Sequence, residues 1–443
     1  MLFSMNESTE LTIQYIEKYL EAFRSIYLPS LLKNEAYYLG KNPTIMNRTF
    51  EDSSKPNNKI ASGWGKYIIT QISGYFGGKP VVVDSTDQSL LQEIEYFDRN
   101  NDTISKNMTL SKYVSEFGYC AEILYMDDDK NIYTLPQKPT SIFPIYSESS
   151  PDKLLYAIRF YDTYDVLTGN VITYVDVYTE TNIKHYKTSN TTNLAFIDEI
   201  THYFKEVPVI FYYNNDDLTS DTQAVHSEID CYDLALSDDT NFREEINDSY
   251  LIFTNTNLDN EDIMTMKKAK VIQIESSMDG QQASVNFLNR DANDTQAENF
   301  KSRLENDIKT FSFVKDIESA KSHTTATSAQ IGLLGIEQIC TIKEAYFRKA
   351  LLKRYELLIN YLAITKTQYD INTVSLTFVR NLPQDLTVIG DIVSKMNGVV
   401  SKKTLLKQIP FVSDIDEELS QIESENNINS YASLFDMGSD NND

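Results

Sequence analysis

The sequence predicts an α+β protein that is mainly helical, and three patterns lead to this fold class. Residues 8–118 repeat apolar side chains at helical spacing. Residues 121–213 contain short β-rich runs separated by turn residues. Beyond residue 223, two long helical segments flank a small β-rich insert, and a third long helix follows. With 443 residues, the chain is long enough for two to four domains.

The N-terminal region is predicted to consist of helices interrupted by one polar loop. Apolar residues in i,i+4 steps predict a helix over residues 8–32, which Pro29 should end or bend. Turn residues predict a loop at 51–60. A helix should then start near Trp64 and close at Gly77 and Gly78. Two more helices are expected at 90–99 and 110–118.

The middle of the chain is predicted to be a β-rich body. Residues 121–126 and 132–135 form a hairpin pattern around the acidic turn 127–131. That turn lacks the glycine and the distal glutamate of an EF-hand loop, so it is interpreted as a turn and not as a calcium site. The remaining β-rich runs are 155–161, 171–178, 183–186 and 207–213.

The C-terminal half is predicted to contain three long helices. An acidic helix over 223–248 precedes the insert at 250–289, and a capping box at 295–298 starts the second helix. A polar loop follows at 315–325, and then the longest helix, over 327–365, is apolar on most sides and should be buried by several neighbours. A strand at 374–379, a helical segment to about 425 and a polar, disordered acidic tail complete the chain.

The charge balance argues against a protein that binds nucleic acid tightly. There are 40 Lys and Arg against 65 Asp and Glu, which gives a net charge of −25. Strong phosphate binding needs the opposite sign. The three cysteines have no zinc spacing and fit a reducing compartment. Because no run approaches the roughly 18–20 apolar residues of a membrane span, we expect no membrane partner.

No pattern in the sequence argues for catalysis. The four histidines lack metal-ligand spacing, and there is no phosphate-binding loop, dinucleotide fingerprint or nucleophile elbow. The glycine-rich stretch 74–80 ends a predicted helix instead of opening one, so it is not placed to cradle phosphate. Adjacent carboxylates are expected by chance at this acidity. The sequence therefore predicts no enzyme, no cofactor and no metal site.

The order of elements and several local strings resemble the portal family of tailed phages, of the siphophage (SPP1-like) type. The strings occur in the family's order over about 400 residues. They are Tyr37-Tyr38-x-Gly40, Pro56-Asn57-Asn58-Lys59-Ile60, Gly74-Tyr75-Phe76-x-Gly78-Lys79-Pro80, Val207-Pro208-Val209, Ile229-Asp230-x-Tyr232-Asp233, Leu333-x-Gly335-Ile336-Glu337 and Ile409-Pro410-Phe411-Val412. Lys205 departs from the family, which often has glycine there, and the short C-terminal segment implies a small crown.

The resemblance implies a portal fold divided into wing, stem, clip and crown. Residues 1–222 would be the wing, 223–249 and 291–313 the two stem helices, and 250–290 the clip. Residues 314–326 would be the tunnel loop and 327–370 the long wing helix. The crown would span 371–427, with a disordered tail at 428–443.

The resemblance also implies site residues, all of them structural. The tunnel loop would face DNA through Lys315, Asp316, Lys321, Ser322, His323, Thr324 and Thr325. The clip would face terminase or adaptor proteins through Lys267, Lys268 and Lys270. The stem would pack through Ile229, Tyr232, Leu236, Phe300, Leu304 and Ile308. A solvated connector and a solvated turn remain the alternatives for the first two sets.

The function that the resemblance implies is a ring of twelve copies at one capsid vertex, through which double-stranded DNA passes without sequence-specific contact. Implied partners are the terminase large subunit, a head-completion or adaptor protein, and the major capsid and scaffolding proteins. Assembly is expected in the host bacterial cytoplasm and the final location in the virion. The rival interpretations are an acidic head or tail interaction protein without a channel, an α+β enzyme, and, least favoured by the charge, a DNA-binding protein.

Overall fold

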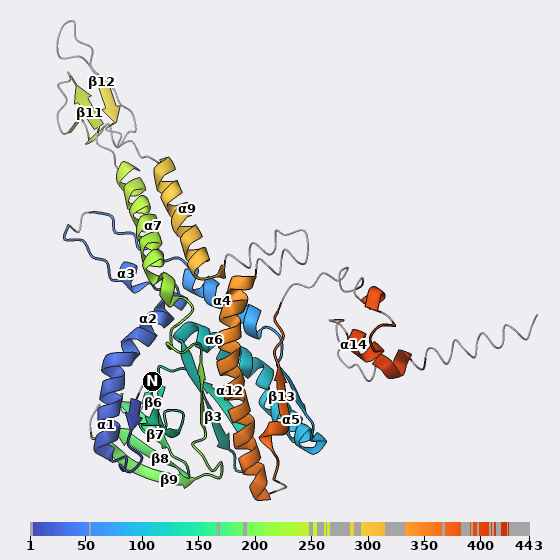
Figure 1. Cartoon of the computed structure of the whole chain (residues 1–443). Coiled ribbons are helices and arrows are strands. Elements are labelled where there is room, and N and C mark those ends of the chain that lie inside the picture. The colour runs from blue at the N-terminus through green and yellow to red at the C-terminus, as the bar shows by residue number, and fades with distance from the viewer. Residues whose placement is uncertain are drawn as a thin grey trace, which may run out of the picture. The chain divides into compact units, whose positions relative to one another are not determined.

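The computed structural model divides into two units, residues 1–380 and 381–443. It describes residues 3–52, 55–164, 166, 169–188, 193–247, 251–254, 261–262, 264–265, 284–287, 294–314, 333–365 and 368–381, with short stretches between 390 and 424. In the second unit the described residues include one short helix, α14 (Lys402–Leu406). The first unit mixes helices and strands (Figure 1).

The first helical region runs further than the sequence predicted. Helix α1 (Ile13–Ala22) passes through a π-helical turn, Phe23–Tyr27, into α2 (Leu28–Tyr38). The predicted end at residue 32 is therefore wrong. Pro29 lies in the first turn of α2, where a missing N–H costs little, and the wider turn directly before it absorbs the change in hydrogen bonding. The short helix α3 (Pro43–Met46) follows.

Three further helices confirm the predicted order. They are α4 (Trp64–Gly77), α5 (Gln88–Asn101) and α6 (Thr103–Phe117). Gly118 ends α6 with φ of 90°, and a Cβ there would collide with the carbonyl of Leu218. Only glycine therefore lets the chain turn so sharply from α6 into the next strand.

Two main sheets build the body. The six-stranded sheet has the order β1-β5-β6-β7-β8-β9, in which only the β1–β5 pair is parallel. Its strands are β1 (Phe3–Met5), β5 (Ile142–Ser147), β6 (Leu154–Tyr164), β7 (Val171–Tyr178), β8 (Asn182–Thr188) and β9 (Ala195–Thr201). The three-stranded sheet has the order β10-β3-β4, with β10 (Val209–Tyr213), β3 (Tyr119–Met126) and β4 (Ile132–Gln137).

The predicted hairpin is confirmed as the β3–β4 pair. Leu124 lies opposite Thr134 in an antiparallel register. In the acidic turn between these strands, the Asp127 carboxylate accepts a hydrogen bond from the Asn131 backbone N–H at 2.7 Å. This carboxylate therefore stabilises the turn itself.

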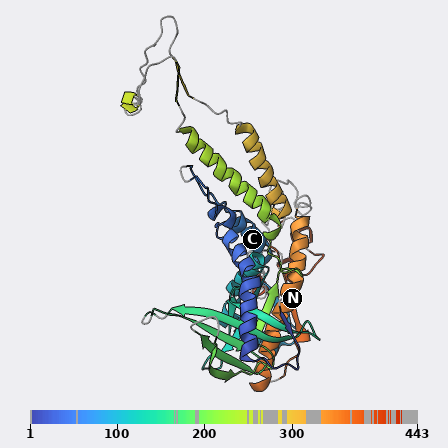
Figure 2. The ribbon, with the colours of Figure 1, turned by 90° about the vertical axis from the view of Figure 1, so that its left-hand side faces the viewer.

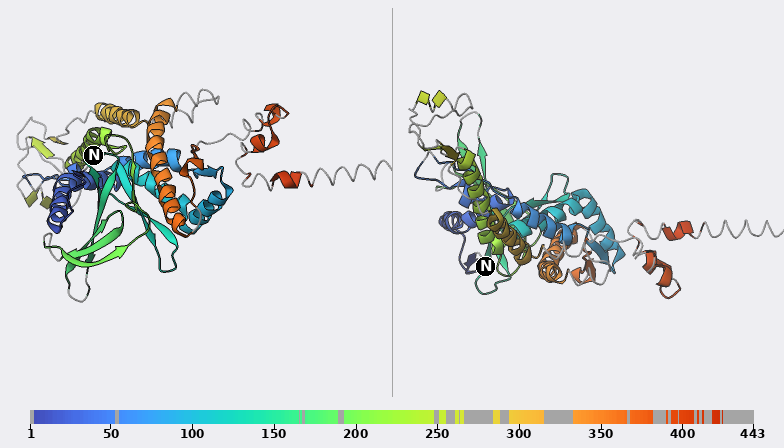
Figure 3. Two further views of the ribbon diagram at one scale, coloured as in Figure 1. Left: turned by 60° about the horizontal axis from the view of Figure 1, so that its bottom comes forward. Right: turned by 90° about the horizontal axis from the view of Figure 1, so that it is seen from above.

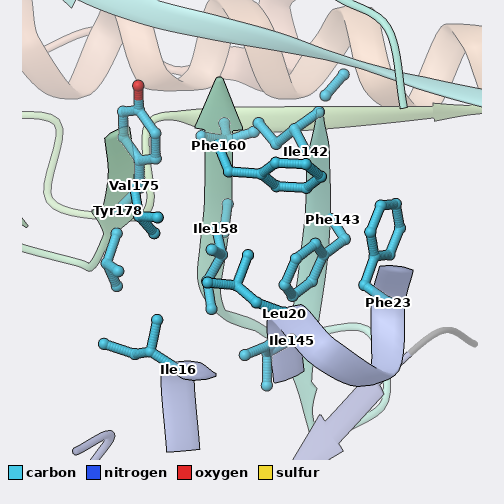
Figure 4. Close-up of a cluster of buried hydrophobic side chains, with 14 of the residues drawn as sticks. Ile16, Leu20, Phe23, Ile142, Phe143, Ile145, Ile158, Phe160, Val175 and Tyr178 are labelled. Atoms are coloured by element: carbon cyan, nitrogen blue, oxygen red, sulfur yellow. The ribbon is translucent and has the colours of Figure 1, made fainter. Parts of the chain in front are cut away.

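A core of buried hydrophobic residues lies between the six-stranded sheet and the α1–α2 region (Figure 4). Ile16, Leu20 and Phe23 point from the helical side toward the sheet. The ring of Phe23 stacks on Phe143 with 4.7 Å between centroids, and it meets Phe160 edge-on at 5.8 Å. Burial of these aromatic rings fixes the helices on one face of the sheet.

The longest helix, α12 (Leu334–Thr365), crosses the body and packs against β10 (Figures 1 and 3). Its described start lies after the predicted one at residue 327, which falls outside the described residues. Phe347, Leu351, Tyr355 and Leu358 are buried. After α12, β13 (Val374–Thr377) pairs antiparallel with β2 (Val82–Ser85), which confirms a predicted strand.

Candidate functional site: the two-helix stem and its base

Two helices that flank the insert in sequence pack side by side, and we call this pair of helices the stem. They are α7 (His226–Asn247), entered through a 3-10 turn at Gln223–Val225, and α9 (Asp294–Phe311). Both views in Figures 1 and 2 show the pair projecting from the body. Between them in sequence, β11 (Leu251–Thr254) and β12 (Ser284–Phe287) form an antiparallel pair.

The six residues predicted to pack the stem differ in burial. Ile229 and Ile308 are fully buried. Tyr232, Leu236 and Leu304 are half-buried. Phe300 is 52% exposed. Between the helices, the Lys301 ammonium donates to the Asp239 carboxylate at 3.2 Å, which sets Asp239 of α7 level with Lys301 of α9.

The base of the stem is fixed by two carboxylates of α7, one buried and one half-buried. Asp233 is fully buried and accepts hydrogen bonds from the Asn42 side-chain amide and the Ser62 backbone N–H, each at 2.8 Å. One turn earlier, Asp230 accepts from the Tyr37 hydroxyl at 2.6 Å and from Thr44 at 2.9 Å. Charge-assisted hydrogen bonds of this kind are the stronger ones in proteins.

The polar loop before α4 continues these contacts along the same helix. The Arg48 guanidinium donates to the Asp238 carboxylate at 2.7 Å. The backbone N–H of Asn58 donates to the Asn241 side chain at 2.7 Å, and the Asn58 amide donates to Glu244 at 2.6 Å. The loop therefore follows α7 for more than two turns on one face.

Burial controls the charge state at this base. Desolvation raises the pKa of Asp233, while the hydrogen bonds from Ser62 and Asn42 oppose this change. Desolvation, helped by the positive charge of Lys33, lowers the pKa of His226 to about 4. His226 is therefore neutral at pH 7, which suits its stacking on the Tyr37 ring with 3.9 Å between centroids.

The single tryptophan marks the junction of body and stem. Trp64 begins α4, and its ring meets Tyr232 of α7 edge-on at 5.8 Å. The Lys309 ammonium of α9 lies 5.8 Å from the same ring. Three elements that are far apart in sequence therefore meet at one side chain.

Behind the stem base, two fully buried cations fix α12 to the body. The Arg354 guanidinium donates to Glu122 of β3 at 2.8 Å, and Tyr212 of β10 donates to the same carboxylate at 2.7 Å. The Lys343 ammonium donates to Asp221 at 2.7 Å and to the Ser115 hydroxyl at 2.6 Å. Each cation is paired with a carboxylate, which offsets part of the free-energy cost of removing the cation from water.

The other predicted site residues lie outside the described part of the chain. This holds for the seven tunnel-loop residues from Lys315 to Thr325 and for the three clip lysines, Lys267, Lys268 and Lys270. The contacts at the base of the stem were not predicted, although the strings that contain Tyr37 and Asp233 were both noted in the sequence. Asn42 and Asp233 are 191 positions apart, and no spacing rule joins such residues before the chain folds.

Most of the chain matches one family of known proteins. Residues 18–430 match the family model described as phage portal protein, SPP1 Gp6-like. The chain belongs to this portal family. The portal protein of Bacillus phage SPP1 is 23% identical over 441 residues, which cover 91% of this chain and 84% of that protein. The portal protein of Clostridium phage phiCD119 is 22% identical over 423 residues, covering 87% of this chain and 90% of that protein.

Solved structures also resemble the chain, and one of them does so at low sequence identity. The chain titled "Neck of empty GTA particle computed with C6 symmetry" has a TM-score of 0.43 and 10% identity, covering 81% of this chain and 89% of that chain. Phage portal proteins are structural virion components, and this chain is a member of their family. Among the described residues, no helix is long and apolar enough to cross a membrane.

Proposed function

We propose that this portal-family chain forms a closed ring at one capsid vertex and that double-stranded DNA passes through the ring during packaging and ejection. The observation that carries the proposal is the pair of stem helices, of which α7 is fixed to the body by the carboxylates of Asp230 and Asp233. Family membership over residues 18–430 supports the same role. A ring needs each copy to present two different faces to its neighbours, and a stem rigidly oriented on its body keeps those faces in a constant relation.

The charge of the chain suits a conduit. Its net charge is −25, so a ring of such chains repels a duplex instead of holding it. The tunnel-loop residues Lys315 and Lys321, with His323, would make brief phosphate contacts that carry no sequence information. A wall that bound phosphate tightly would stall the moving DNA.

The finer assignments complete the proposal. The wing is residues 1–222, the stem 223–249 and 291–313, the clip 250–290, the tunnel loop 314–326, the long wing helix 327–370 and the crown 371–427. The ring has twelve copies. The clip meets the terminase large subunit and later a head-completion protein, while the wing and crown meet capsid and scaffolding proteins. Assembly takes place in the host bacterial cytoplasm.

Electron microscopy of the purified full-length chain tests the proposal. We expect annular particles with a central hole and a mass of about 610 kDa for twelve copies of the 50.8-kDa chain. Native mass spectrometry would give the number of copies. Compact particles without a hole at all salt and protein concentrations would contradict the proposal and would favour an acidic head or tail protein without a channel.

A further inference from the structure

The stem carries two exposed stripes that have different chemistry. On α9, Phe300, Arg303, Asp307 and Phe311 follow the spacing i, i+3, i+7 and i+11, so they share one flank of the helix over about 16 Å. Phe300 and Phe311 are 52% and 55% exposed, and the Arg303 side chain is 81% exposed. Arg303 lies 3.7 Å from the Asp307 carboxylate, so this flank presents one ion pair between two exposed aromatic rings.

The second stripe lies on α7 and ends in a groove. Cys231, Ala235, Asp238 and Phe242 follow the spacing i, i+4, i+7 and i+11. Cys231 and Asp238 are exposed, and Ala235 and Phe242 are half-buried. Small side chains at Cys231 and Ala235 leave room for a neighbouring helix to approach.

The groove beside this stripe is open to solvent, and both apolar and acidic side chains line it. It lies between α7 and the loop after α3 and is lined by Phe50, Glu51, Asp52, Lys55, Pro56, Asp238, Asn241 and Phe242. Phe50 is 41% exposed. Three carboxylates and one lysine line the groove, and the Arg48 guanidinium pairs with one of these carboxylates, Asp238, at 2.7 Å. The groove keeps a net negative charge, which suits an aromatic ring with a nearby cation.

The two stripes face different directions. In Figures 1 and 2 the loop lies beside α7 on the side away from α9. The hydrogen bonds agree, because Asp239 faces Lys301 of α9, while Asp238 and Asn241, which line the groove, accept hydrogen bonds from Arg48 and Asn58 of the loop. A closed ring needs two such complementary surfaces on separate sides of one subunit.

We propose that the α9 stripe of one copy docks on the α7 stripe of the next copy, with Phe300 in the groove and Arg303 beside the Glu51 and Asp238 carboxylates. This proposal rests on the proposed ring. Neighbours in a ring are related by rotation about one axis, so residues at the same height on two neighbouring stems face each other. The Asp239–Lys301 contact fixes those heights, placing Arg303 near Asp238 and the Asp307–Phe311 end near Cys231.

Cross-linking through the natural Cys231 tests the contact in the full-length chain. Cys231 is exposed, whereas Cys120 and Cys340 are buried. With Phe311→Cys or Asp307→Cys, a short bis-maleimide should give a ladder of dimers, trimers and larger species on a denaturing gel. The Asp307→Cys variant keeps both Phe300 and Phe311. The same variants with Cys231→Ser should give no ladder, and neither should Ser302→Cys, which lies on another side of α9.

Charge reversal gives an independent measure. Arg303→Glu should raise the concentration at which rings dissociate about tenfold, and adding Glu51→Lys should restore most of the loss. Rings seen by microscopy that give no ladder with either cysteine variant would overturn the docking and leave the proposed function intact. A parent chain that forms no ring under any condition would overturn the proposed function itself.

Discussion

At the scale of single residues, the body depends on buried charges that have partners. Arg354 and Glu122 are both completely buried, and Tyr212 and Asn107 add hydrogen bonds to the pair. Removing one member would leave an uncompensated charge in the interior, which costs far more than the pair contributes. The same helix carries an exposed pair, Lys349 with Asp152, that lacks this sensitivity.

We expect Arg354→Met to lower the free energy of unfolding by about 3–5 kcal/mol, because Glu122 would lose its counter-ion without gaining water. The matched control Lys349→Met should change it by less than about 1 kcal/mol. Urea unfolding followed by circular dichroism measures both. Equal effects of the two substitutions would show that burial of the pair is not what matters.

Glu116 is a buried carboxyl that is favoured in its protonated form, and it leads to a pH-dependent prediction. It is buried in α6, and desolvation raises its pKa from 4.5 to about 7, despite the opposing charges of Lys112 and Lys138. The folded protein therefore holds this proton more tightly than the unfolded chain does. Its contribution to stability is greatest below the unfolded pKa and is lost as pH rises from about 4.5 to about 7.

Glu116→Gln removes the cost of ionising this buried carboxyl. The variant should be more stable than the parent at pH 8, by roughly 2–3 kcal/mol, and should gain little at pH 4, where the parent carboxyl is already protonated. Denaturant unfolding of both proteins at the two pH values gives the difference. A parent-minus-variant difference that is independent of pH would contradict the assignment.

At the scale of elements, the orientation of the stem depends on the polar contacts between α7 and the loop before α4. Asp233 is the centre of these contacts, because it joins α7 to both Asn42 and Ser62. Trp64 lies at the same junction, against Tyr232 and near Lys309. The chain therefore carries its own fluorescent reporter of stem docking.

We expect Asp233→Ala to shift the emission of Trp64 to longer wavelength and to destabilise the fold by about 1–3 kcal/mol, because two buried donors lose their acceptor. The control Asp128→Ala removes an exposed carboxylate in the turn between β3 and β4, away from the stem, and should leave the emission unchanged. Steady-state fluorescence in the absence of denaturant measures the shift. If the emission of the Asp233→Ala variant is not shifted, residues other than Asp233 hold the stem on the body.

At the scale of the whole molecule, the proposed channel leads to a prediction about DNA. Lys315→Glu combined with Lys321→Glu should reduce the length or yield of packaged DNA, because the loop would then repel phosphate instead of contacting it briefly. Lys349→Glu, on the body, serves as the control. Packaging assays with rings of each variant measure DNA protected from nuclease, and unchanged packaging would discard the role of these lysines.

Much of the element order could be predicted from periodicity alone. The helices before residue 118, the β3–β4 hairpin and the long helices around the insert all follow patterns within one element. Strands β1, β2, β5 and β9 were missed, and the reason is clearest for the last two. Phe143 to Ile145 contains Pro144, and every residue of β9 is exposed, so neither run alternates as a half-buried strand should.

The amino-acid sequence by itself determined the family and the presence of two helices on either side of an insert, because these depend on local patterns and on strings kept in order. Only the tertiary structure decided that Asp230 and Asp233 of α7 receive the donors of Tyr37, Asn42 and Ser62. It also decided which flanks of the stem stay exposed. Contacts between positions almost two hundred residues apart arise from the folded path of the chain, and no local pattern encodes them.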